Sequence, residues 1–69
     1  MQFRWMFTEY GQRVLDPHWH NTPKAAGKCC RRELRSTADG TSHLTVELSH
    51  RGGLLTTGQL DRFADTVSQ

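Results

Sequence analysis

The feature that most constrains this chain is a turn signal between two runs of alternating residues. Asp39 and Gly40 separate residues 29–35 from residues 44–51, and an Asp-Gly pair in this setting indicates a β-hairpin. A two-residue turn would set charged side chains of the first run opposite apolar side chains of the second. A three-residue loop, with Gly40 left-handed, shifts the pairing by one residue and matches apolar with apolar. We therefore predict a hairpin over 29–51 in this second register.

The predicted hairpin separates its side chains onto a buried face and a solvated face. The buried face consists of Cys30, Leu34, Leu44, Val46 and Leu48. The solvated face consists of Arg31, Glu33, Arg35, His43, Thr45 and Glu47. Arg31 stands opposite Glu47 there as a pair of opposite charges. Arg32 is the exception, because it falls on the buried face, and its environment therefore tests whether this register is right.

The N-terminal residues alternate with a period of two. Phe3, Trp5 and Phe7 share one face, which predicts a strand over 2–10 with its aromatic side inward. A turn at residues 10–11 leads into a return strand over 12–16, with Val14 beside Phe7. Three apolar side chains would face outward and offer a small patch to a partner or to a second copy of the chain: Met6, Tyr10 and Leu15.

Residues 17–28 form the longest irregular stretch, which we predict to be a loop. Inside it, Thr22 would cap a single helical turn, Pro23 would take the first helical position, and Gly27 would end the turn.

The C-terminal part carries the strongest helix signal. Thr56 is a capping residue, and Gln59 three positions later completes a capping box. Leu55 and Leu60 would pack across it as a hydrophobic staple. The helix is predicted over 57–67, with one apolar stripe: Leu60, Phe63, Ala64 and Val67.

These elements predict an α+β fold with one domain over residues 1–69. A small antiparallel sheet of three to four strands, in the order β-β-loop-β-β, would carry one C-terminal helix on one face. The predicted core is Phe3, Trp5, Phe7, Val14, Leu34, Leu44, Val46, Leu48, Leu55, Leu60, Phe63 and Val67. A chain of 69 residues buries a modest core, so a partner, a second copy or a metal would add stability.

The composition points to a cytoplasmic protein that does not contact a membrane. No apolar run is long enough to span a bilayer, and Arg4 interrupts the start before any signal-peptide segment. Cys29 and Cys30 are adjacent, and neighbouring cysteines on a strand point to opposite faces. We predict two reduced thiols and no disulfide framework.

A basic segment runs from Lys24 to Arg35. It contains Lys24, Lys28, Arg31, Arg32 and Arg35, with Glu33 as its only acidic residue. The segment carries +4 while the whole chain carries +2, so the remainder is slightly negative. Such residues can contact phosphates, and Trp19 in the preceding loop can stack on a base. The alternative is a solvated strand face paired with acidic neighbours.

Four residues could offer metal ligands: His18, His20, Cys29 and Cys30. Structural zinc sites usually show cysteines or histidines separated by two to five residues. Neither spacing occurs here, so we predict no metal and no cofactor, with a zinc site as the lesser alternative.

We predict a small non-enzymatic binding module, because no P-loop, nucleophile elbow or metalloprotease motif occurs. No catalytic residues are assigned. The leading hypothesis is an inhibitor or adaptor that binds another protein through the polar hairpin face and the 17–28 loop. The first alternative is a nucleic-acid-binding module that uses the basic segment, and a homodimer is a further candidate assembly. The predicted binding residues are Trp19, Lys24, Lys28, Arg31, Arg35, His43 and Glu47.

Overall fold

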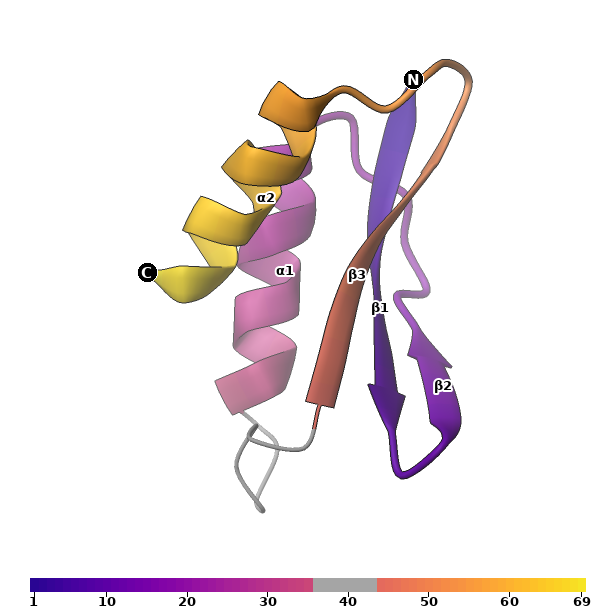
Figure 1. Cartoon of the computed structure of the whole chain (residues 1–69), viewed down its shortest axis with the longest axis vertical. Helices are drawn as coiled ribbons and strands as arrows, with labels where there is room; N and C mark the ends of the chain where they lie inside the picture. The colour runs from indigo at the N-terminus through magenta and orange to yellow at the C-terminus, as the bar shows by residue number, and fades with distance from the viewer. Residues whose placement is uncertain (36–43) are drawn as a thin grey trace.

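The computed structural model describes residues 1–35 and 45–69 together with the backbone of residue 44. Its elements follow the order β1 (Gln2–Glu9), β2 (Gln12–Leu15), α1 (Pro23–Arg35), β3 (Leu44–Arg51) and α2 (Thr57–Ser68). The strands form an antiparallel sheet in the order β2-β1-β3. Figure 1 shows the two helices side by side next to the sheet. The predicted α+β class and antiparallel sheet are confirmed, but the sheet carries two helices instead of one.

The N-terminal hairpin forms as predicted. In β1 and β2, Phe7 pairs with Val14. The turn residues Tyr10 and Gly11 have φ values of 48° and 79°, and positive φ at both central residues is what a tight two-residue hairpin turn requires. Phe3, Trp5 and Phe7 are all buried on one face of β1, which makes this strand the centre of both the sheet and the core.

The predicted hairpin over 29–51 is wrong, because residues 29–35 belong to α1. The predicted turn at 37–40 lies outside the described residues. Helix α1 buries Ala26 and Cys30 and packs Leu34 against the core from the same stripe. Arg32 is exposed in this arrangement, whereas the strand register placed it inside. The helix thus removes the one conflict that the hairpin carried.

The start of α1 was predicted correctly and its end was not. Thr22 Oγ1 accepts a hydrogen bond from Ala25 N at 3.1 Å, and Pro23 is the first helical residue, as the capping pattern indicated. Gly27 does not end the helix. It is buried against α2, where a Cβ atom would lie 2.7 Å from Thr66 Cβ. The missing side chain therefore serves close helix packing.

Strand β3 pairs with β1, its distant neighbour in the sequence, along its whole length. Trp5 lies opposite Leu48 and Phe7 lies opposite Val46. The two aliphatic side chains extend the aromatic face of β1 and pack against the core cluster. This register keeps the apolar residues of both strands on the face that the helices cover.

Helix α2 begins with the predicted capping box. The Thr56 hydroxyl accepts from Gln59 N at 3.2 Å, and the Gln59 side chain accepts from Thr56 N at 2.9 Å. However, α2 packs chiefly on α1, through Phe63 and Thr66. The predicted apolar stripe is therefore turned partly away from the sheet, and Leu60 is 43% exposed.

Most of the predicted core is confirmed. Phe3, Trp5, Phe7 and Phe63 are buried, and five further predicted residues pack against them: Leu34, Val46, Leu48, Leu55 and Val67. Two predictions are wrong. Val14 is 46% exposed because β2 is an edge strand while α1 packs over β1, and Leu60 lines a groove between α2 and β3. The Leu44 side chain lies outside the described part. No helix among the described residues is long and apolar enough to cross a membrane.

Candidate functional site

The chain leaving β2 stays hydrogen-bonded to the edge of β1. Asp16 N donates to Trp5 O at 3.1 Å, and His20 and Phe3 exchange both of their backbone hydrogen bonds at 2.7 Å. Directly paired residues of antiparallel strands point to the same face. Asp16 and His20 are thus held on the buried face beside Trp5 and Phe3, and residues 17–19 bulge between them.

The Asp16 carboxylate is the most deeply buried charged group of this edge, with 0% of the residue exposed. Its Oδ1 accepts a hydrogen bond from His18 N at 2.9 Å. Its Oδ2 lies 2.8 Å from Nε2 of His20. A buried carboxylate needs such donors because its removal from water destabilises the fold by several kcal/mol unless other hydrogen bonds replace those to water. Removing one partner from a buried ion pair costs about 3–5 kcal/mol.

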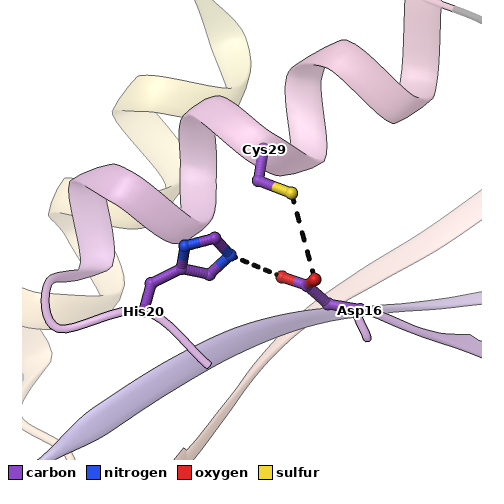
Figure 2. A group of neighbouring side chains, drawn as sticks. All are labelled: Asp16, His20 and Cys29. Atoms are coloured by element: carbon purple, nitrogen blue, oxygen red, sulfur yellow. Dashed lines mark hydrogen bonds and ion pairs between the residues drawn. The ribbon is translucent and has the colours of Figure 1, made fainter. Parts of the chain in front are cut away.

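Cys29 reaches the same carboxylate from α1, as Figure 2 shows. Its Sγ donates to Asp16 Oδ1 over 3.9 Å, and it accepts a hydrogen bond from Trp5 Nε1 at 3.1 Å. The sulfur thereby satisfies the buried indole N–H of Trp5. We name the group Asp16, His20 and Cys29 the edge cluster. One potential ligand atom from each of its members lies within 4.8 Å of the other two.

The adjacent thiol of Cys30 has a different environment. Its residue is 0% exposed and belongs to the core cluster. Burial, together with the neighbouring Cys29 and Asp16, raises the pKa of the Cys30 thiol to about 12 from an ordinary 9.0. Cys30 therefore stays protonated and acts as a small apolar residue. Of the two predicted cysteine ligands, only Cys29 is in the edge cluster.

The edge cluster does not have the arrangement of a thiol nucleophile with its base. That arrangement needs the thiol hydrogen-bonded to histidine, with the carboxylate behind. Here the carboxylate lies between the two, and among the described residues no hydrogen bond joins Cys29 to His20. What the cluster offers is one oxygen, one nitrogen and one sulfur donor that converge.

Asp16 is the functional candidate that sequence analysis missed, because it was interpreted only as the end of a strand. The available signal was the spacing Asp16, His18, His20 on a segment following a strand. Alternate residues of an extended chain share a face. That pattern does not reveal the third member, since Cys29 lies 13 residues from Asp16 along the chain.

The predicted basic residues form a second candidate site, on α1 instead of a strand. Their positions are spaced by four, three and four residues, which places them in one row along a helix: Lys24, Lys28, Arg31 and Arg35. We name this row the basic row. Three of its members are exposed, and Arg31 is half-buried, with its guanidinium 3.4 Å from Gln69 Oε1. Arg62 of α2 shares a shallow hollow with Lys24.

The remaining predicted binding residues are not brought together. Trp19 is half-buried, and the guanidinium carbons of Arg4 and Arg51 lie 4.4 and 4.2 Å from its ring centroid. Trp19 therefore covers the sheet. Glu47 is on β3, on a different element from Arg31 and Arg35, and His43 lies outside the described residues. Arg31, Arg35 and Glu47 therefore do not share a strand face.

The predicted outward apolar patch is only partly arranged as expected. Met6 and Leu15 are directly paired, and Leu15 and Tyr10 are 46% and 78% exposed. Met6 is half-buried. A binding role for this patch stays a prediction.

The chain matches no protein-family model, no curated protein and no solved structure. The function is therefore argued from its own residues.

Proposed function

We propose that the chain is a small nucleic-acid-binding module that contacts phosphates through the basic row of α1. The observation that supports this most strongly is the gathering of four cationic side chains in one row on one helix. Arg32 is exposed on the same helix, and Arg62 borders the hollow next to Lys24. Each group can release a counterion when it meets a phosphate.

The dimensions of the basic row suit a nucleic-acid backbone. Lys24 and Arg35 are eleven residues apart, which corresponds to about 16 Å along a helix axis at 1.5 Å per residue. Duplex DNA carries one charge per strand about every 3.4 Å. The row can thus follow a few phosphates in succession, without any requirement for base recognition.

The charges of the basic row are available for a ligand. Between two described residues, the ion pairs are those of Asp16 with His18 and with His20. None of Lys24, Lys28 and Arg35 is held by a described carboxylate. Lys24 also lies in the first turn of α1, which has no acidic residue. A cation there interacts unfavourably with the positive end of the helix dipole and destabilises the fold. A lysine at a position where it does not stabilise the fold is consistent with a role in binding.

The leading sequence hypothesis, a protein partner, stays a prediction. It used the polar hairpin face together with the 17–28 loop and the outward apolar patch, and of these the hairpin face is changed because Arg31 and Arg35 lie on α1. We infer a cytoplasmic location along with the nucleic-acid proposal, since that reducing compartment keeps free thiols such as Cys29 and Cys30 reduced.

Fluorescence anisotropy tests the proposal with labelled duplex DNA, duplex RNA and single strands over a range of NaCl concentrations. Neutralising four phosphates predicts a slope of log K against log salt of about −3 to −4. Lys28→Glu should weaken binding and make the slope shallower, with its magnitude reduced by about 1 or more. Arg13→Glu on the exposed β2 edge makes the same charge change away from α1 and is the matched control.

Three results would overturn the proposal. The first is that none of these probes binds at low salt. The second is that Lys28→Glu and Arg13→Glu weaken binding equally. The third is that polyglutamate at equal charge concentration displaces the nucleic acid. The last result would indicate an acidic protein as the ligand of the basic row.

A further inference from the structure

We propose that the edge cluster is a zinc site, with Asp16, His20 and Cys29 as its protein ligands. The three donors are carboxylate oxygen, imidazole nitrogen and thiol sulfur, a mixed set that suits Zn²⁺ as a borderline-soft ion. They come from three places: the end of β2, the return of the chain onto the β1 edge, and the middle of α1 (Figure 2). This inference is independent of the nucleic-acid proposal, which uses other residues.

The two distances to the Asp16 carboxylate lie on either side of the spacing that tetrahedral zinc requires. Zinc-to-ligand distances of 2.0–2.3 Å place neighbouring ligand atoms about 3.3–3.7 Å apart. His20 Nε2 lies 2.8 Å from Asp16 Oδ2, and Cys29 Sγ lies 3.9 Å from Asp16 Oδ1. These two contacts end on different carboxylate oxygens, and the three ligand atoms lie within 4.8 Å of one another, so they need to approach by up to about 1 Å to reach tetrahedral spacing. Rotation of the carboxylate exchanges the oxygen that faces the ion.

Two of the proposed ligands already accept hydrogen bonds of the kind that orient metal ligands in known sites. Trp5 Nε1 donates to the Cys29 sulfur at 3.1 Å, and His18 N donates to the Asp16 carboxylate at 2.9 Å. The Trp5 N–H therefore fixes the position of the Cys29 sulfur next to the carboxylate. These contacts make the cluster a preorganised site and not a chance group of surface side chains.

The charge of the buried carboxylate supports the same conclusion. Asp16 is 0% exposed, and its described ion-pair partners are histidines, which carry charge only when protonated. A divalent ion would place a full positive charge beside this buried carboxylate. Binding would release the Cys29 thiol proton to solvent as the Zn–S bond forms, while neutral His20 binds through Nε2.

The fourth position is available to His18 or to water. The His18 side chain is 74% exposed, and its Nδ1 lies 3.7 Å from Asp16 Oδ1. An exposed side chain can turn toward the ion with little change in packing. With His18, the site would be closed and structural, and with water it would be open.

The rival explanation is that the cluster only satisfies the hydrogen bonds of Asp16. Metal titration of the reduced 69-residue chain separates the two, with a non-thiol reductant and Co²⁺ as an optical probe. The zinc-site proposal predicts one ion per chain, a sulfur-to-cobalt charge-transfer band, displacement of Co²⁺ by Zn²⁺, and a rise in thermal midpoint that EDTA reverses.

Matched variants identify the ligands. Cys29→Ser should abolish the charge-transfer band and weaken Zn²⁺ affinity by more than about 100-fold, whereas Cys30→Ala should retain both. His20→Gln keeps a hydrogen-bond donor for Asp16 and should weaken affinity to the same degree. His50→Gln, at the exposed end of β3, should not.

The proposal is overturned by an absent band in the wild-type chain, by a band that survives Cys29→Ser, or by an unchanged melting transition in the presence of Zn²⁺. Circular dichroism of each variant checks that it is folded. If Cys29→Ser does not fold, His20→Gln and the wild-type titration decide the question.

Discussion

Gly27 of α1 lies directly against Thr66 of α2. A Cβ atom on Gly27 would lie 2.7 Å from Thr66 Cβ and 2.9 Å from Thr66 Cγ2. Thr66 is itself 1% exposed, and its hydroxyl donates to Arg62 O at 2.8 Å. The two helices therefore meet at the one point where α1 has no side chain.

This contact predicts that Gly27→Ala destabilises the fold, although alanine is the better helix former. The substitution should gain about 0.5–1 kcal/mol of helix propensity, but it forces α1 and α2 apart at a cost of about 1–3 kcal/mol. Gly58→Ala is the control, because the nearest atom to its added Cβ is 4.0 Å away. Urea unfolding should show a lower midpoint for Gly27→Ala and a higher one for Gly58→Ala. The same sign for both would contradict the packing argument.

The two adjacent thiols should differ in reactivity. Cys29 is half-buried and Cys30 is fully buried, with its pKa raised to about 12. Brief alkylation at pH 8 of the metal-free chain should label Cys29 and leave Cys30 unmodified until the protein unfolds. Peptide mass spectrometry distinguishes the sites through Cys29→Ser and Cys30→Ala. Equal labelling rates in the folded chain would show that the core is open at Cys30.

The raised pKa of Cys30 also predicts a loss of stability in alkaline solution. The folded state keeps this proton up to about pH 12, while the unfolded state loses it near pH 9. Stability from this group is therefore complete below pH 9 and falls above it, by at most about 1.4 kcal/mol per pH unit. Cys30→Ala should show a shallower decline between pH 9 and 11 in denaturant unfolding. An identical decline in both proteins would assign the effect to other groups.

Replacing Lys24 should raise the stability of the fold and weaken nucleic-acid binding. Lys24→Glu replaces a cation in the first turn of α1 with an anion, which suits the helix dipole and should add about 0.3–1 kcal/mol of stability. The same change should weaken nucleic-acid binding, because it reverses one charge of the basic row. Thermal unfolding and anisotropy on the same sample measure both quantities. A variant less stable than the wild-type chain would contradict the dipole argument, and unchanged binding would remove Lys24 from the phosphate contacts.

Trp19 should stabilise the sheet through the guanidinium groups over its ring. Trp19→Leu keeps an apolar cover but removes the aromatic face, and Arg51→Met keeps the aliphatic stem but removes the charge. A double-mutant cycle between these changes should give a coupling free energy of about 0.5–1 kcal/mol. Additive effects would mean that the ring and the Arg51 guanidinium only pack together.

The elements that were predicted correctly depend on short-range patterns. The alternating aromatics of β1, the capping of α1 by Thr22 and the Thr56–Gln59 capping box each involve residues within a few positions. The interactions that form these elements involve residues close in sequence, so the patterns can be recognised without knowledge of the rest of the chain. The exposed positions of Lys24, Lys28 and Arg35 follow from the same helix pattern once residues 29–35 are known to be helical.

Local sequence patterns were enough to predict the β1–β2 hairpin, the start of α1, the position of α2 and the aromatic half of the core. The other features depend on long-range packing. Residues 29–35 form a helix because it brings Cys30 and Leu34 onto the core and sets Gly27 against α2. Strand β3 joins β1 because that register packs Val46 and Leu48 beside the aromatic face of β1. The edge cluster arises in the same way. Asp16, His20 and Cys29 meet only when α1 packs beside β1. These contacts depend on the burial of apolar residues that are far apart in the sequence, and local conformational preferences do not set them.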